Sequence, residues 1–161
     1  MMGLKNRALR MLPRAVLAFV CIFVCREISA ARDVALVTGK NSQFKVVKAA
    51  DLAKMIRTTH KWPDGYDLTV VLTDPSSPDM RIVAEKLLSL TTDEFKNMID
   101  AANKTRVAFR VVSGDDEALR ILQSNPSGIA LVNVYSINSN IEVLKIDGKL
   151  PLEPGYILHG Q

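Results

Sequence analysis

The sequence feature that most constrains the fold is an apolar run followed by a polar turn and a helix start. The run covers residues 68–72, and the turn after it covers residues 73–77. A short apolar run that ends at turn residues is typical of a strand buried on both faces. Ser77 suits the position before a helix, because its hydroxyl can accept a hydrogen bond from a backbone N–H, and Pro78 suits the first helical position, because it has no N–H. The stretch therefore predicts a central strand, a loop and a helix.

The start of this helix also suggests a function. The hydroxyls of Ser76 and Ser77 and the first backbone N–H groups of the helix converge at the positive end of the helix dipole. Such a group of donors suits an oxyanion. The alternative is an ordinary capped helix that binds nothing.

The first 31 residues have the pattern of a signal peptide. An apolar run at residues 15–24 is followed by small residues at 29–31 and preceded by four basic residues, Lys5, Arg7, Arg10 and Arg14. The run is shorter than the roughly 20 apolar residues that cross a bilayer. The sequence therefore predicts a signal peptide at 1–31 and a periplasmic or secreted domain at 32–161, with no stable membrane insertion after leader cleavage. An uncleaved anchor is the alternative.

The predicted leader changes the interpretation of charge and cysteine content. It holds five of the 21 basic residues and one of the 17 acidic residues, which leaves 16 of each in the domain. A domain without net charge does not have the basic composition of nucleic-acid-binding proteins, so no nucleic acid is expected as a partner. Cys21 and Cys25 both lie in the leader, so the domain can use no disulfide, thiolate nucleophile or cysteine metal ligand.

Further strands and helices alternate along residues 32–161. Strands are predicted at 33–38, 107–112, 129–134 and 141–146, and helices at 49–58, from 78, from 91 and from 118. Thr91 and Glu94 form a capping box, in which a threonine before the helix and a glutamate three residues later satisfy each other's backbone N–H. The tail after Pro151 is predicted to be irregular. This alternation predicts an α/β fold, a three-layer α/β sandwich with a mixed or mostly parallel sheet.

The order and spacing of these signals resemble the periplasmic phosphate-binding-like (PBP-like, type 2 solute-binding) family, specifically its short exported members with a single domain. The signals that carry the resemblance are the segments at residues 40–42, 62–65, 76–78, 87–94, 114–119, 125–130 and 143–148. The resemblance implies one PBP-like lobe over residues 32–161. It also implies an exported solute-binding protein of a phosphate ABC transporter, with phosphate or a similar oxyanion as ligand, a transporter permease or envelope protein as partner, and no cofactor.

The same resemblance implies a set of ligand-binding residues: Ser76, Ser77, Asp79, Met80, Lys40, Asn41 and Ser42. Two positions depart from the family pattern, because Met80 and Thr73 stand where arginines are expected. Asp79 stabilises the helix start but would compete with a bound anion. Phosphate can still bind if Asp74 or Asp79 accepts a hydrogen bond from its protonated form. The chain is long enough for about one of the two lobes that full-length relatives close around the ligand.

Enzymatic activity is not expected. Residues 32–161 contain no G-x-S-x-G elbow, no H-E-x-x-H pair and no glycine-rich phosphate loop. His60 follows a helix end, where a solvated histidine interacting with the last carbonyls is expected, and His159 is given no role. The adjacent acids at 115–117 predict a helix start and no metal site, because hard cations need ligands spread around them. Two functions remain open: oxyanion binding, and a non-catalytic envelope interaction or sensor module that keeps the fold without ligand binding.

Overall fold

A five-stranded mixed sheet forms the centre of the computed structural model, which describes residues 32–160. The predicted leader at 1–31 lies outside the described residues. In spatial order the strands are β4 (Phe109–Val111), β3 (Thr69–Leu72), β5 (Gly128–Asn133), β1 (Val34–Gly39) and β6 (Ile141–Val143). β4, β3 and β5 are parallel, and β1 is antiparallel to both β5 and β6. The predicted mixed sheet is therefore confirmed.

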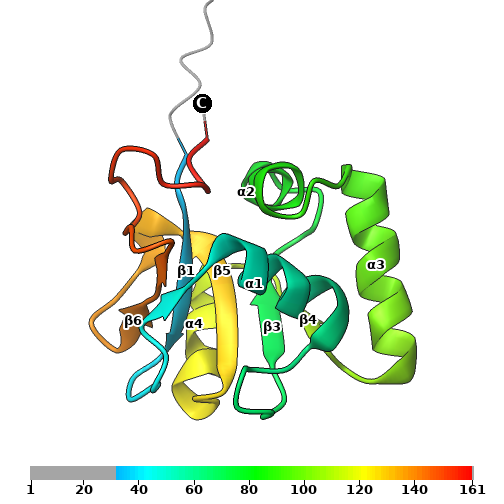
Figure 1. Ribbon diagram of the computed structural model, residues 1–161, viewed down its shortest axis with the longest axis horizontal. Coiled ribbons are helices and arrows are strands. Elements are labelled where there is room, and N and C mark those ends of the chain that lie inside the picture. The colour runs from blue at the N-terminus through cyan, green and yellow to red at the C-terminus, as the bar shows by residue number, and fades with distance from the viewer. Residues whose placement is uncertain (1–31, 161) are drawn as a thin grey trace, which may run out of the picture. The chain divides into compact units, whose positions relative to one another are not determined.

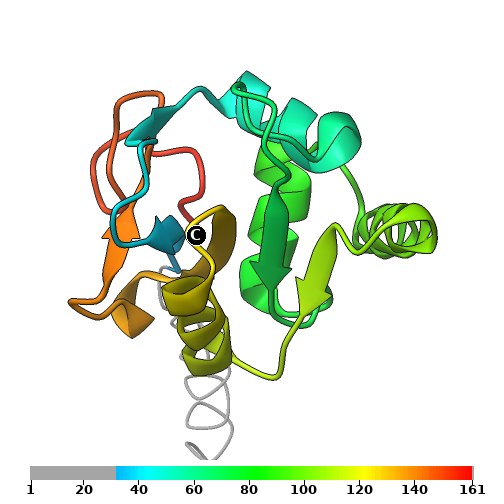
Figure 2. The same ribbon diagram turned by 90° about the horizontal axis from the view of Figure 1, so that it is seen from below.

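Helices cover both faces of the sheet (Figures 1 and 2). Buried residues of α1 (Ala49–Lys54), α2 (Pro78–Ile82) and α3 (Thr92–Thr105) join one core cluster, and those of α4 (Asp115–Ser124) join a second cluster on the other face. The first two helices continue as wider π-helical turns, η1 (Met55–Thr59) and η2 (Val83–Leu87). The result is the expected three-layer α/β arrangement. Within residues 32–160, no helix is long and apolar enough to cross a membrane.

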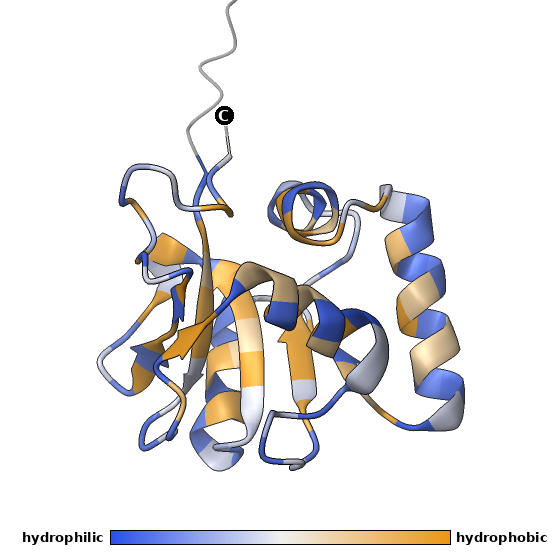
Figure 3. Cartoon of the chain, in the orientation of Figure 1, coloured by the Kyte–Doolittle hydropathy of each residue, from blue (hydrophilic) through white to orange (hydrophobic). Residues whose placement is uncertain are grey.

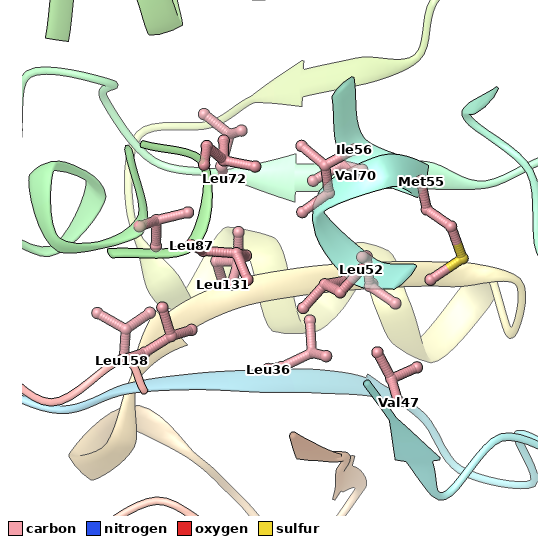
Figure 4. Packing of buried hydrophobic residues seen from close by; sticks show 14 of the residues in the cluster. Leu36, Val47, Leu52, Met55, Ile56, Val70, Leu72, Leu87, Leu131 and Leu158 are labelled. Atoms are coloured by element: carbon pink, nitrogen blue, oxygen red, sulfur yellow. The ribbon is translucent and has the colours of Figure 1, made fainter. Parts of the chain in front are cut away.

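Successive side chains of each strand point to opposite faces of the sheet. On the face covered by α1, α2 and α3, Leu36 of β1 and Leu131 of β5 pack among helix residues such as Leu52 (Figure 4). On the face covered by α4, the neighbouring residues are Ala35 and Ala130. Small residues on this face allow α4 to lie close to the sheet. The sheet as a whole is apolar and the loops are polar, as Figure 3 shows.

The run at residues 68–72 lies in the interior of the sheet, next to the middle strand β5, and is buried on both faces as predicted. β3 lies between β4 and β5, and Val70, Val71 and Leu72 are all fully buried. Val70 and Leu72 belong to the core under α1, α2 and α3, whereas Val71 belongs to the core under α4. Both faces of the strand are therefore covered.

Three differences from the predicted elements go beyond a shift of one or two residues at a boundary. The segment 141–146 forms two strands. The Leu144 N–H donates to the Leu36 carbonyl of β1, whereas the N–H of the next residue, Lys145, donates to the Lys45 carbonyl. β7 (Lys145–Ile146) then pairs with β2 (Val46–Val47), a two-residue strand that was not predicted. The third difference is α4, which begins at 115 instead of 118, because its acidic residues occupy the first turn, where the helix dipole favours them.

The C-terminal segment is irregular, as predicted, yet it completes the core. Tyr156 and Leu158 are buried in the cluster under α1, α2 and α3. The backbone N–H of Val34 donates to the Leu158 carbonyl at 3.0 Å, and the Tyr156 hydroxyl donates to the Val34 carbonyl at 3.0 Å. Burial raises the pKa of Tyr156 far above its ordinary value. The segment thus holds the beginning of β1.

Candidate functional site

The carboxyl ends of β3, β4 and β5 lie at one edge of the sheet, because the three strands are parallel. The chain leaves β3 towards β4 on one side and leaves β5 towards β6 on the other. The edge between β3 and β5 is therefore the topological switch point, where open α/β sheets bind their ligands. Residues 73–79 and Asn133 lie on its two sides.

The serine loop after β3 is fixed by its own hydrogen bonds. Ser77 Oγ accepts a hydrogen bond from the Met80 N–H at 3.3 Å, which confirms Ser77 as the cap of α2. The Ser76 N–H donates to Asp74 Oδ1 and the Ser77 N–H to the Asp74 carbonyl, both at 2.8 Å. Ser76 itself is exposed. Its hydroxyl is thus carried by a rigid turn at the edge of the sheet.

Met80 does not contribute a side chain to this edge. It is fully buried in the core under α1, α2 and α3. A ligand contact by the Met80 side chain, which the resemblance implied, is therefore corrected. The reason is helical geometry: Met80 of α2 stands on the same apolar face as Val83 and Ala84 of η2, the face that packs on the sheet.

Asp79 spans the switch point. Its Oδ2 accepts a hydrogen bond from Asn133 Nδ2 at 3.2 Å, and its Oδ1 lies 3.4 Å from Arg32 Nη1. The carboxylate joins the first turn of α2 to the end of β5 and is mostly shielded from solvent, with 17% of its side chain exposed. A carboxylate is thus held here between an amide and a guanidinium, which are the donors that an oxyanion would use.

Asn133 connects this contact to the other face of the sheet. Its backbone N–H donates to Asp115 Oδ2 at 3.0 Å, and the Ser136 hydroxyl donates to the same oxygen at 2.6 Å. Its side-chain oxygen accepts a hydrogen bond from the Tyr135 N–H at 3.1 Å. Asn133 was not predicted from the sequence as a site residue. The available signal was a polar residue at the end of an otherwise apolar strand.

An open depression of about 720 Å³ lies at the start of α4. Its lining includes Asp115, Asp116, Glu117 and Arg120. Glu117 accepts hydrogen bonds from the N–H and hydroxyl of Ser113, at 3.0 and 2.7 Å, and these bonds lower the pKa of Glu117. The excess of carboxylates makes this depression unfavourable for anions. Within the described residues, no group of three His, Cys, Asp or Glu side chains could hold a metal ion.

The second predicted loop, residues 40–42, lies at the opposite edge of the sheet. β1 is antiparallel to β5, so that Thr38 pairs with Ile129, near the beginning of β5, whereas Leu72 of β3 pairs with Leu131, towards the end of β5. Lys40 and Asn41 are exposed, and Ser42 is buried. The structure therefore does not bring together residues 40–42 and the serine loop, both of which the resemblance implied as ligand-binding. The reason is the direction of β1.

Residues 41 and 42 instead border a small pocket of about 200 Å³ beside the turn at residues 62–65. Trp62 is buried there, stacks on Phe44 with ring centroids 4.0 Å apart, and donates from its indole N–H to the Ser127 carbonyl at 2.9 Å. Trp62 therefore packs the turn at residues 62–65 against the core.

Both histidines have partners or surroundings that the sequence did not suggest. His159 Nδ1 lies 2.6 Å from Oδ1 of the buried Asp33, so this residue, which was given no role, anchors the C-terminal segment to β1. His60 ends η1 in the left-handed conformation, with φ of 47°. Its Nδ1 is buried without a hydrogen-bond partner, and burial together with the Arg106 guanidinium lowers the pKa of His60. The expectation of a solvated His60 is corrected.

No protein-family model and no curated protein matches the sequence. Solved structures do match the fold. PstS from Borrelia burgdorferi is 15% identical, with 81% of this chain and 55% of that chain covered and a TM-score of 0.62. An ABC-type phosphate transport receptor from Vibrio cholerae is 12% identical, with 81% and 54% covered and a TM-score of 0.61.

A third match comes from Clostridium perfringens. It is assigned as a phosphate ABC transporter substrate-binding protein and contains bound phosphate. It is 16% identical, with 73% of this chain and 46% of that chain covered and a TM-score of 0.58. The chain thus spans about half the length of these proteins, and its fold resembles about half of theirs.

Proposed function

We propose that this protein is an exported, non-enzymatic solute-binding module that holds phosphate or a similar oxyanion at the edge between β3 and β5. The observation that supports this best is the pair of donors at the switch point. The Asn133 amide and the Arg32 guanidinium each face one oxygen of the Asp79 carboxylate. The same edge is where an open α/β sheet of this topology places its ligand.

The donors around this edge match the chemistry of a tetrahedral oxyanion. Arg32 supplies positive charge, Asn133 supplies a neutral N–H, and the serine loop supplies the exposed hydroxyl of Ser76 and the first N–H groups of α2. Charge-assisted hydrogen bonds of this type bind phosphate more strongly than neutral ones. Phosphate is proposed because two of the matched structures are described as a phosphate ABC transporter substrate-binding protein and a phosphate transport receptor. Met80 and residues 40–42 lie away from this edge and are not included.

One lobe covers only one side of a ligand. A two-lobed protein encloses its ligand and excludes water, whereas a single lobe leaves half of the ligand's hydrogen bonds to solvent. We therefore expect weaker phosphate binding than in a closed cleft. A second lobe, supplied by another protein such as a transporter permease, would complete the site.

A second candidate is an envelope interaction or sensor module that keeps the fold and binds no solute. The observation that favours it is that the chain's own carboxylates already use the donors at the edge. Asp79 takes the Asn133 amide, and Asp115 takes the Asn133 backbone N–H and the Ser136 hydroxyl. An envelope protein would then be the partner.

Thermal melting with and without anions separates the two candidates. If the edge binds an oxyanion, phosphate or sulfate at about 100 times the dissociation constant adds about 2.7 kcal/mol, which raises the melting temperature by several degrees. Ser77→Ala should cost about 1 kcal/mol through the lost cap, with or without anion, and should also reduce the anion-dependent rise.

Thr91→Ala is the matched control, because Thr91 caps α3 through the Glu94 N–H at 3.3 Å and lies in another loop. It should lower the melting temperature and leave the anion-dependent rise intact. A parent protein that does not respond to millimolar phosphate or sulfate would favour the interaction module.

A further inference from the structure

We infer that Asp79 is a built-in competitor of the ligand, whose carboxylate occupies the oxyanion position until an anion displaces it. This inference rests on the proposed function and concerns the regulation of the same site. Both oxygens of the carboxylate are engaged, Oδ1 with Arg32 and Oδ2 with Asn133. A phosphate that used these two donors would need the same space and would meet a like charge.

The position of Asp79 in its helix does not by itself explain these contacts. Asp93 stands at the same place in α3, the second helical residue, and both acids stabilise their helix through the dipole. Asp93 is exposed, and within residues 32–160 it makes no side-chain hydrogen bond or ion pair. Of these two acids, only Asp79 reaches a strand end, at Asn133, a residue 54 positions further along the chain.

Competition by Asp79 lowers the apparent affinity for phosphate, although the donors Arg32 and Asn133 stay the same. The binding-competent form is the one in which the carboxylate has left Asn133, and the measured affinity is reduced by the fraction of molecules in that form. The carboxylate that moves aside stays nearby and repels the bound anion. The site would then fill only at high anion concentration, or when a partner binds Asp79 and frees the donors.

An Asp79 that helps to bind phosphate and an Asp79 that competes with phosphate predict opposite effects of mutating this residue. If Asp79 accepted a hydrogen bond from a protonated phosphate, it would be part of the ligand site, and its loss would weaken binding. If Asp79 is the competitor, Asp79→Asn keeps the size of the side chain, removes the charge, and should tighten binding. Titration calorimetry of inorganic phosphate into the full chain at neutral pH measures the difference.

The expected result is a dissociation constant about tenfold lower for Asp79→Asn than for the parent, which corresponds to about 1.4 kcal/mol. Asp93→Asn, the matched control, should leave the constant unchanged. Adding Asn133→Ala to Asp79→Asn should remove the gain, because one of the two freed donors is lost. Asp79→Ser, which also removes the charge, provides a second variant if the asparagine protein does not fold.

The outcomes distinguish this inference from the proposed function. If the parent binds phosphate and both Asp79 variants bind it equally or more weakly, Asp79 is not a competitor, and the proposed function stands. If the parent and every folded Asp79 variant show no heat of binding with millimolar phosphate, the oxyanion site itself is absent, and both are overturned.

Discussion

At the scale of single residues, His60 lies in surroundings that disfavour its protonated form. The left-handed turn at its backbone directs the ring inward, where it meets Phe109 edge-on with ring centroids 5.5 Å apart. The Arg106 guanidinium bonds to the His60 carbonyl and to Asp67, which leaves a cation beside the ring. Burial and this cation both disfavour the imidazolium and lower the pKa of His60.

Stability should therefore fall when the pH drops from 7 to 5. The unfolded chain takes up the proton of His60 near its ordinary pKa of 6.5, whereas the folded protein takes it up only at lower pH. Below 6.5 the unfolded state thus binds more protons, and acidification favours it. The midpoint of urea denaturation, measured at pH 5 and pH 7, should show this fall in the parent.

His60→Asn tests the assignment, because asparagine tolerates the left-handed backbone and does not titrate. This variant should lose part of the fall between pH 7 and 5. His159→Asn is the control, since it removes the other histidine of the domain but leaves the surroundings of His60 intact. An equal fall in the parent and in His60→Asn would contradict the prediction.

The distance along the chain decides which residue roles the sequence reveals. The caps Ser77 and Thr91 bond to residues three positions away, so their roles follow from local pattern. Asn133 and Asp79 are 54 positions apart, and Asp33 and His159 are 126 apart. No local rule predicts such pairs, because they exist only after the strands have been ordered in the sheet.

At the scale of elements, β4 shows how an outer strand of the sheet is protected. Among residues 32–160, no strand pairs with its outer side. The Asn103 side chain of α3 takes the place of one: it accepts hydrogen bonds from the N–H groups of Ala108 and Phe109, at 3.1 and 2.9 Å, and donates to the Phe109 carbonyl at 3.0 Å. Covered edges do not pair with other chains, so this contact disfavours aggregation.

The central strand should not tolerate a charge. Val70→Asp places an unpaired carboxylate at a fully buried position of β3, which costs several kcal/mol against a total stability of roughly 5–15 kcal/mol. We expect circular dichroism to show an unfolded protein. Val107→Asp is the matched control, because Val107 is 75% exposed, and it should melt close to the parent. A folded Val70→Asp protein would mean that β3 is not central.

Strands and helices with a strong hydrophobic pattern could be predicted from the sequence, whereas the pairing of the strands could not. The apolar runs of β3 and β5 indicated buried strands because both faces carry apolar residues. β2 and β7 were not predicted as separate strands, since two residues cannot show an alternation. Residues 40–42 follow β1, so the direction of β1 determines at which edge of the sheet they lie. That direction depends on how the whole chain connects the strands, which no local sequence pattern shows.

At the scale of the whole molecule, the division into a leader and a domain is a prediction about processing. The charged start, short apolar run and small residues within 1–31 predict cleavage near residue 31. N-terminal sequencing of the protein purified from the envelope fraction should begin at residue 31 or 32. An intact Met1 in the membrane fraction would instead indicate an anchored protein.

The strand order β4-β3-β5-β1-β6 has a consequence for the time course of folding. β1 is the first strand of the domain, yet its neighbours β5 and β6 come about 90 to 100 residues later in the chain. Contacts of such long range form slowly. During synthesis, β3 and β4 can pair with the helices between them while β1, whose six residues are all buried in the folded domain, still has no partner. Its apolar, β-prone run is therefore the segment that a holding chaperone should bind, and the one through which incompletely synthesised chains should aggregate.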